Sequence, residues 1–126
     1  KERYNELGGI VLDASITVHR ELGPGLLESA YEIALARELE LRGLKIKRQV
    51  VVEFVYKEID LGKIYVMDML VEDEIILEIK SVDTYQPIFD AQLITYLKLA
   101  NKKLGYVINF NVPLLKEGFK RIVYRF

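Results

Sequence analysis

The chain has 126 residues, of which 51% are hydrophobic and 29% are charged, and its formal net charge is −1. These values predict a single domain over residues 1–126 and exclude a disordered chain. No apolar run approaches the ~20 residues that a membrane-spanning helix needs, so we expect no membrane partner. Because the chain has no cysteine and one histidine, disulfides, zinc–thiolate sites and histidine metal clusters are excluded, and any bound metal must have oxygen ligands, which favours Mg²⁺, Mn²⁺ or Ca²⁺.

Two helices are predicted at the start of the chain. Apolar residues recur at helical spacing over Tyr4–Glu21, and the LGPG turn at residues 22–25 ends this pattern because proline between two glycines does not continue a helix. A second helix follows over about Leu26–Arg42, where Gly43 is placed to cap its C-terminus.

The pattern then changes to strands. Three runs rich in Val and Ile predict an antiparallel meander, and they cover Ile46–Tyr56, Ile59–Val71 and Ile75–Val82. Because successive strands of a meander lie side by side, side chains from the second and third runs are expected to meet on one face of the sheet.

A third helix and two further strands complete the predicted order. Pro87 opens a helix that extends to about Asn101. Leu104–Phe110 is short and aliphatic and predicts a buried strand, and Phe119–Phe126 alternates like an edge strand. The order ααβββαββ predicts an α/β or α+β fold in which helices pack on a mixed sheet.

The aliphatic run Ile75–Val82 carries two charged residues in its middle, Glu78 and Lys80. Residues two apart on a strand share a face, so both side chains point the same way. Burying such charges is unfavourable unless they are paired. Either this face of the strand is hydrated, or the two charges have a chemical role.

The preceding strand contributes one acid, Asp68, and the length of the intervening loop decides whether it meets Glu78. A three-residue loop over Glu72–Glu74 pairs Val71 with Ile75, and Asp68 then lies opposite Glu78 with Cβ atoms ~5 Å apart. A two-residue turn would shift the register by one position and separate the acids.

Two carboxylates opposed in an apolar setting are tolerated when a divalent cation lies between them or when one of them is protonated. Lys80 would offset part of their charge and polarise a water molecule on the cation. Together these are the parts of a metal-assisted hydrolase. Spacing alone favours a more common arrangement, a half-exposed sheet face with a surface cluster of Asp, Glu and Lys.

Two pairs of helical residues add to this pattern. Glu28 precedes Tyr31 by three residues, and Gln92 precedes Tyr96 by four, so each pair shares one side of its helix. Both pairs also have ordinary explanations. An acid in the first turn interacts favourably with the helix dipole, and a helical Gln can be exposed beside a Tyr in the core.

The stretch GLLESAY resembles the G-x-x-E-x-x-Y signature of the small bacterial and archaeal GxxExxY proteins, with Gly25, Glu28 and Tyr31 at the three signature positions. These proteins are placed in the PD-(D/E)XK nuclease-like superfamily. The likeness continues through DMLVEDEIILEIKSV and AQLITYLKL to LGYVINFNVPLLKEG. It implies a restriction-endonuclease-like core, αβββαβ, with a mixed sheet.

The resemblance also implies a role for each residue of the predicted site. Asp68 corresponds to the first catalytic acid, and Glu78-Ile79-Lys80 corresponds to (D/E)-x-K. Asp68 and Glu78 would bind Mg²⁺ or Mn²⁺, and Glu28 and the backbone carbonyl of Ile79 would add ligands. Lys80 would orient the attacking water and stabilise charge in the transition state.

Gln92 and Tyr96 resemble the Q-x-x-x-Y motif of the RecB-like and lambda-exonuclease-like branches, in which this motif helps to orient the site and the substrate. Two positions depart from the family pattern. Val66 stands where an Arg is usual, and Phe89 stands where a His is frequent. These departures affect substrate contacts, whereas the predicted metal ligands and the lysine are intact.

We therefore expect a cytoplasmic nuclease dependent on Mg²⁺ or Mn²⁺ that acts on nucleic acid, DNA rather than RNA. The apolar last strand makes a homodimer a candidate assembly. Two alternatives remain open. One is a catalytically silent nuclease-fold module for binding or assembly, which the near-neutral charge favours. The other is a small-molecule phosphodiesterase that uses the same cation.

Overall fold

Over residues 2–126, the part of the chain that the computed structural model describes, three α-helices pack against a five-stranded sheet. The sheet has the strand order β1-β4-β5-β6-β7, and β5 and β6 are its parallel pair. The elements are α1 (Glu2–Leu22), α2 (Glu28–Leu41), β1 (Ile46–Val51), β2 (Val55–Tyr56), β3 (Ile59–Asp60), β4 (Val66–Val71), β5 (Ile75–Lys80), α3 (Pro87–Ala100), β6 (Leu104–Asn109), a short 3₁₀ helix (Leu115–Gly118) and β7 (Phe119–Val123).

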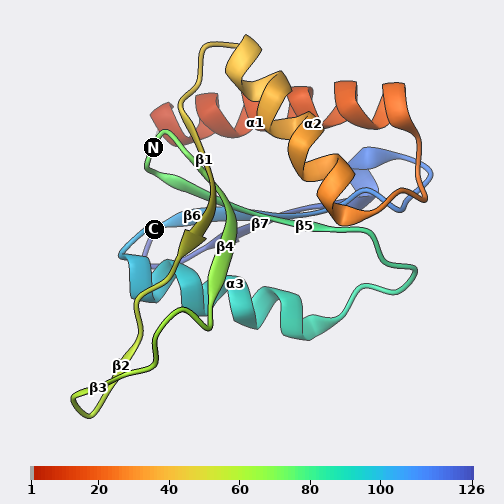
Figure 1. Ribbon diagram of the computed structural model, residues 1–126. Coiled ribbons are helices and arrows are strands. Elements are labelled where there is room, and N and C mark those ends of the chain that lie inside the picture. Colours follow the sequence, from red (N-terminus) through yellow and green to blue (C-terminus); the bar gives the residue numbers. More distant parts are fainter. Residues whose placement is uncertain (1) are drawn as a thin grey trace.

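The helices lie in two layers, one on each side of the sheet. Figure 1 shows α1 and α2 together over one face and α3 on the opposite face. In β5, the side chains of Ile75, Leu77 and Ile79 belong to the core under α1 and α2, whereas Ile76 belongs to the core against α3. Alternation along the strand therefore directs Glu78 towards the α3 side of the sheet. This layered arrangement of helices on a mixed sheet confirms the predicted fold class.

Glycine ends α2 as the sequence predicts. Gly43 has φ +86°, a left-handed conformation that favours a residue without a side chain. Its amide and that of Leu44 donate to the carbonyl oxygens of Glu40 and Leu39, at 2.9 and 3.2 Å. This is the Schellman pattern of a helix C-terminus, and it turns the chain into β1.

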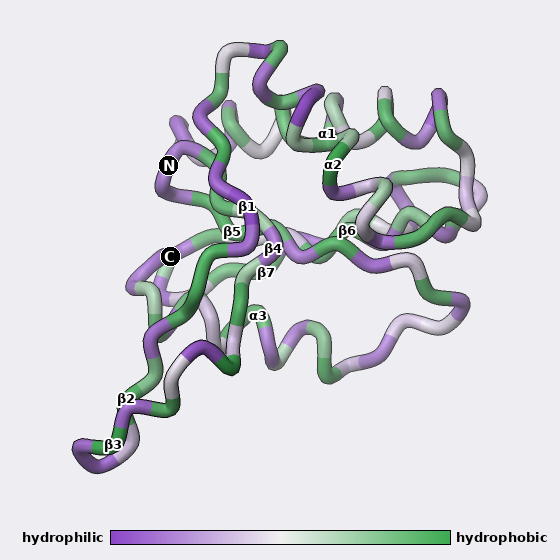
Figure 2. The backbone as a smooth tube through the Cα atoms, in the orientation of Figure 1, coloured by the Kyte–Doolittle hydropathy of each residue, from purple (hydrophilic) through white to green (hydrophobic). Residues whose placement is uncertain are grey.

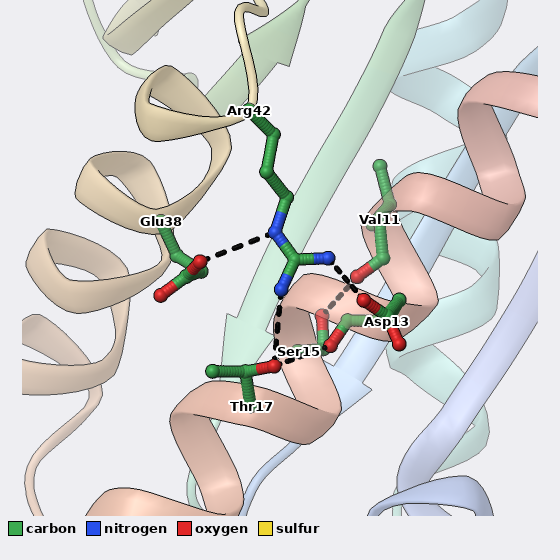
Figure 3. A network of polar contacts seen from close by, with 6 residues as sticks. All are labelled: Val11, Asp13, Ser15, Thr17, Glu38 and Arg42. Atoms are coloured by element: carbon green, nitrogen blue, oxygen red, sulfur yellow. Dashed lines mark hydrogen bonds and ion pairs between the residues drawn. The ribbon is translucent and has the colours of Figure 1, made fainter.

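Arg42, one residue earlier, ties α2 to α1 through polar contacts (Figure 3). Its guanidinium donates to Glu38 at 3.1 Å within α2 and to the hydroxyl of Thr17 in α1 at 3.0 Å, and it forms an ion pair with Asp13. The two helices are thereby held at the end of α2 where the chain leaves for the sheet.

Two of the predicted strands, Ile46–Tyr56 and Ile59–Val71, are wrong in extent, because each is broken in two. Only β1 and β4 pair within the main sheet, and residues 52–65 between them project from the body as an arm whose tip is the β2–β3 hairpin (Figure 1). Its two turn residues, Lys57 and Glu58, both have positive φ, as a two-residue hairpin turn requires. Strand propensity does not reveal whether a strand stays on the sheet, which is why the break was not predicted.

The arm is apolar for a surface element. Val55, Tyr56, Ile59 and Ile64 are all more than half exposed. Figure 2 shows hydrophobic and hydrophilic residues alternating along it. The remaining strands end slightly earlier than predicted, β5 at Lys80 and β7 at Val123, and β7 is an edge strand as expected. No helix within residues 2–126 has both the length and the apolar character that crossing a bilayer requires.

Candidate active site

The loop between β4 and β5 has three residues, as the prediction required. Val71 pairs with Ile75, and the pairing continues with Leu70 opposite Ile76 and Met69 opposite Leu77. The amide of Glu74 donates to the carbonyl oxygen of Val71 at 2.9 Å and closes the turn. The next position in this register brings Asp68 opposite Glu78, and the predicted register is therefore confirmed.

At Asp68 and Glu78 the regular ladder stops, and the two acidic side chains take its place. The amide of Asp68 donates to Oε2 of Glu78 at 2.9 Å, and the amide of Ile79 donates to Oδ2 of Asp68 at 2.7 Å. Each carboxylate thus uses one oxygen to bind the backbone of the neighbouring strand. Within residues 2–126, no hydrogen bond reaches the second oxygen of either carboxylate. Two carboxylate oxygens therefore remain available for a ligand at this split in the sheet.

Glu78 is buried and Asp68 is half-buried, and this alters their protonation. Glu78 is 4% exposed, and burial raises its pKa to about 8, with the negative charge of Asp68 adding to the effect. Burial also raises the pKa of Asp68, although the hydrogen bond from the amide of Ile79 lowers it in part. The positive charge of Lys80 acts on both acids in the opposite direction. A bound cation would compensate the charge that burial disfavours here.

Lys80 lies near the two acids without forming an ion pair with either of them in the described part of the chain. Its ammonium group lies over the ring of Phe89, 4.5 Å from the ring centroid. Phe89 in turn contacts Tyr85 edge to face at 5.3 Å. The residue that departs from the family pattern, Phe89, therefore holds the lysine through a cation–π contact.

The G-x-x-E-x-x-Y stretch forms one compact unit at the start of α2. The hydroxyl of Tyr31 donates to the carbonyl oxygen of Gly23 at 2.5 Å and accepts from the amide of Leu26 at 3.1 Å. Gly25, in the turn between Gly23 and Leu26, has φ +93°, a left-handed conformation that favours glycine. Tyr31 thus fixes the turn against the helix and sets where α2 begins, which is at Glu28.

Glu28 lies beside the end of β5. Its Oε2 accepts from the amide of Ser81 at 3.4 Å, and the hydroxyl of Ser81 donates to the carbonyl of Leu26 at 2.6 Å. Its negative charge contributes to the raised pKa of Asp68. Among residues 2–126, however, no three His, Cys, Asp or Glu side chains are grouped closely enough to hold a metal ion. Glu28 therefore stands next to the acid pair and does not form a three-acid cluster with it.

Glu32 is a buried acid near the site that the sequence analysis missed. It is 6% exposed and accepts hydrogen bonds from Nε of Arg48 at 3.0 Å and from the side-chain amide of Gln49 at 2.8 Å. Its charge raises the pKa of both Asp68 and Glu78.

Gln49, one of the two partners of Glu32 on β1, interrupts the hydrogen-bonded pairing of β1 with β4. Gln49 has φ 53° inside the strand, and the pairs Arg48–Met69 and Val50–Met67 on either side of it place it across from Asp68. Asp68 thus lacks regular pairing on both edges of β4.

Gln92 and Tyr96 lie on one side of α3, as predicted, and both line a cavity of about 260 Å³ between α3 and the arm. Tyr96 is 3% exposed, and burial together with the charges of Glu78 and Asp68 raises its pKa to about 12. Tyr96 also packs in the same core as Ile76, which shares a face of β5 with Glu78. Gln92 is half-buried, and its side chain makes no hydrogen bond to another residue in the described range.

The chemistry of these donors suits a divalent cation. Two carboxylates meet at one point, each has a free oxygen, and both have raised pKa values that a cation would lower. The amide of Ile79 points into the same split, and because the N–H and C=O of one strand residue face the same edge, its carbonyl oxygen does so too.

One comparison with known proteins gives a match to the chain. A sequence model of the PD-(D/E)XK nuclease superfamily matches residues 5–122, a stretch that contains the acid pair, Lys80 and the paired residues of α2 and α3. Neither the curated proteins nor the solved structures contain a significant match to the chain.

Proposed function

The chain belongs to the PD-(D/E)XK nuclease superfamily, and on that basis we propose that it is a GxxExxY-type nuclease that hydrolyses phosphodiester bonds in nucleic acid, with DNA as the expected substrate and Mg²⁺ or Mn²⁺ as the cofactor. The observation that carries the proposal is a pair of hydrogen bonds across the split, in which the carboxylate of Glu78 accepts from the amide of Asp68 and the carboxylate of Asp68 accepts from the amide of Ile79. It leaves two carboxylate oxygens together in a buried place where no ladder hydrogen bond uses them.

The free oxygens of Asp68 and Glu78 would hold the cation, together with the carbonyl oxygen of Ile79. Glu28 would bind the cation through a water molecule, because its side chain lies at the end of β5, beside Ser81. When bound, Mg²⁺ or Mn²⁺ supplies a Lewis acid that stabilises negative charge on the phosphate and lowers the pKa of a coordinated water.

Lys80 would orient the attacking water and stabilise the charge that develops on the phosphate. Its present contact with Phe89 is a cation–π interaction, worth roughly 0.5–1 kcal/mol at an exposed position. An interaction of this size holds the ammonium group near the acids and still allows it to move to a phosphate.

Tyr96 and Gln92 would position the substrate. The phenol of Tyr96 is protonated at neutral pH, as an ordinary tyrosine is, and its pKa raised to about 12 by burial and the nearby acids keeps the proton in alkaline solution as well. It can therefore donate a hydrogen bond to a phosphate oxygen. Gln92 has a free amide one turn earlier on the same side of α3 and can contact the same nucleotide.

Cleavage of single- and double-stranded DNA and RNA, with Mg²⁺ and with Mn²⁺, tests the proposal. We expect cleavage by the wild-type chain and a loss of at least 100-fold in Glu78→Ala and Lys80→Ala. The exposed Lys116 provides the matched control, and Lys116→Ala should cut at the wild-type rate. A full panel left uncut by the wild-type chain with both cations would refute the proposal.

A second candidate is a catalytically silent module with the same fold. The observation that favours it is the position of Lys80, whose ammonium lies on Phe89 and forms no ion pair with the acids in the described residues. The edge strand β7 would then offer the surface for a homodimer. Binding of Mn²⁺ that depends on Asp68 and Glu78, without cleavage of any nucleic acid, would favour this candidate.

A further inference from the structure

We propose that the cavity between the arm and α3 is a pocket for one unpaired nucleobase, so that the substrate of this site is single-stranded nucleic acid or the frayed end of a duplex. The inference rests on the proposed function, because it places a nucleotide next to the acid pair. It goes further by naming the class of substrate and the residues that select it.

The cavity is built from two elements that are far apart in the sequence. The arm contributes Phe54 and Tyr65, and α3 contributes Ala91, Gln92 and Tyr96 among its lining residues. Its volume of about 260 Å³ lies below the ~300–1,000 Å³ of pockets that hold drug-sized ligands. It therefore suits a single flat ring system.

Three aromatic rings, those of Phe54, Tyr65 and Tyr96, are part of the lining of this pocket. The rings of Phe54 and Tyr65 lie 6.0 Å apart at 37°, and those of Tyr65 and Tyr96 lie 6.4 Å apart at 62°. Aromatic faces are the usual platforms on which proteins stack unpaired bases, and they accept any base because every base has a π face.

Gln92 adds a polar group to this aromatic lining. Its side-chain amide offers one acceptor and two donors, and no other residue in the range 2–126 uses them. Such an amide can pair with the edge of a base whose Watson–Crick partner is absent. Aromatic faces together with an unused amide fit a nucleobase better than they fit an aliphatic ligand.

Tyr96 connects the pocket to the proposed chemistry. Its ring is part of the pocket lining and packs in the same core as Ile76, which shares a face of β5 with Glu78. A base stacked in the pocket would bring the phosphate of its own nucleotide, or of the adjacent one, towards the acid pair. A base inside a duplex is stacked on both faces and paired along its edge, so only an unpaired base can enter.

The charge of the arm points to stacking as the main source of affinity. Over residues 52–65 there are three acidic residues, Glu53, Glu58 and Asp60, and two lysines, Lys57 and Lys63, so the arm carries a net negative charge. An arm of this charge does not attract a phosphate backbone, and contacts with few phosphates make binding only weakly dependent on salt. The inference therefore accounts for a nucleic-acid substrate on a chain with net charge −1.

The experiment measures binding without cleavage. A short DNA oligonucleotide with one 2-aminopurine is titrated with the Lys80→Ala protein in EDTA, as a single strand and as a duplex, and stacking is followed as quenching of the 2-aminopurine fluorescence. We expect quenching for the single strand, little for the duplex, and roughly tenfold or more weaker binding when Phe54→Leu or Tyr65→Leu is added.

The controls separate a lost ring from a lost fold. Leucine keeps an apolar side chain at each position, and Tyr65→Phe keeps the ring and should retain the quenching. Tyr56 is an aromatic residue of the same arm that is 59% exposed and lies outside the pocket, so Tyr56→Leu should bind like its parent. Thermal unfolding of each variant shows whether the arm substitutions leave the domain folded.

Failure of the pocket is distinguishable from failure of the nuclease. Equal binding of duplex and single strand, or equal effects of Tyr65→Leu and Tyr56→Leu, would overturn the pocket. Cleavage that is lost in Lys80→Ala and unchanged in Phe54→Leu and Tyr65→Leu would also overturn the pocket and leave the nuclease intact. Quenching that depends on Tyr65, in a chain that cuts nothing with Mg²⁺ or Mn²⁺, would support the pocket and overturn the nuclease.

Discussion

The ring of Tyr31 stacks on the ring of Phe110, with centroids 4.5 Å apart and planes within 7° of parallel. The stack anchors α2 to the segment that follows β6, while the hydroxyl of the same tyrosine binds the turn that precedes α2. Tyr31 therefore combines a packing role with a polar one, and the two roles can be separated by removing a single oxygen atom.

Replacing Tyr31 by phenylalanine should keep the stack and remove the two hydrogen bonds to Gly23 and Leu26. We expect the free energy of unfolding to fall by roughly 1–2 kcal/mol, because each of the two hydrogen bonds contributes about 1 kcal/mol and water can reach the half-buried Gly23 and the exposed Leu26. Urea unfolding measures this change. Tyr56→Phe, at an exposed position on the arm, is the control and should unfold like wild type. Equal stability of the two variants would contradict this role for the Tyr31 hydroxyl.

The stability of the metal-free protein should decrease as the pH rises. Burial raises the pKa of Glu78 from 4.5 to about 8, so between these values the folded state binds a proton that the unfolded state has released. This stabilisation is complete below pH ~4.5 and is lost as the pH rises through about 8. In EDTA, we expect the melting temperature to fall by several degrees between pH 5 and pH 8.

Glu78→Gln removes this titrating group and should flatten that dependence. The exposed Glu117 is the matched control, and Glu117→Gln should keep the wild-type slope. Parallel curves for wild type and Glu78→Gln would show that the carboxyl of Glu78 does not carry a shifted pKa.

Divalent cation binding should have the opposite pH dependence. Glu78 must lose its proton to bind a cation, and its raised pKa makes this easier at pH 8 than at pH 6. Titration calorimetry with Mn²⁺ should therefore show tighter binding at pH 8, with loss of binding in Asp68→Asn and in Glu78→Gln. Asp73→Asn, in the exposed loop of the same hairpin, should bind normally. Binding that survives Asp68→Asn would place the cation elsewhere.

The buried acid Glu32 should influence the pair through its charge. Because this charge raises the pKa of Asp68 and Glu78, Glu32→Gln should lower both, and the midpoint of the pH dependence of Mn²⁺ binding should move to lower pH. The same change weakens the contacts with Arg48 and Gln49, so we expect a loss of about 1–3 kcal/mol in the free energy of unfolding. Glu40→Gln, an exposed change on α2, should alter neither measurement. A midpoint unchanged in Glu32→Gln would exclude the electrostatic role.

The sequence predicted those features that depend on short-range rules. The number of residues between Val71 and Ile75 sets the register of a hairpin, so the meeting of Asp68 and Glu78 followed from counting alone. Gly43 and Pro87 likewise mark helix ends through their own backbone preferences.

Features that depend on distant partners could not be predicted in the same way. Glu32 is buried because Arg48 and Gln49 reach it from β1, and no local pattern connects these residues. Lys80 was expected to offset part of the charge of the acids, and it does so, but its contact with Phe89 of α3 was not predicted. The arm has the composition of a sheet strand, but its strands β2 and β3 pair with each other and not with the five-stranded sheet.

The short loop between β4 and β5 also has a kinetic meaning. A hairpin of this kind closes in about 1–10 μs, whereas the parallel pairing of β5 with β6 must wait until the whole α3 crossover is in place. We therefore expect Asp68 and Glu78 to meet early, while both are still hydrated and charged, and to lose water only when α3 docks over them. The docking of α3 is then the folding step that buries the charge of Asp68 and Glu78. Replacing either acid by its amide removes that charge, so at neutral pH the substitution should accelerate this step.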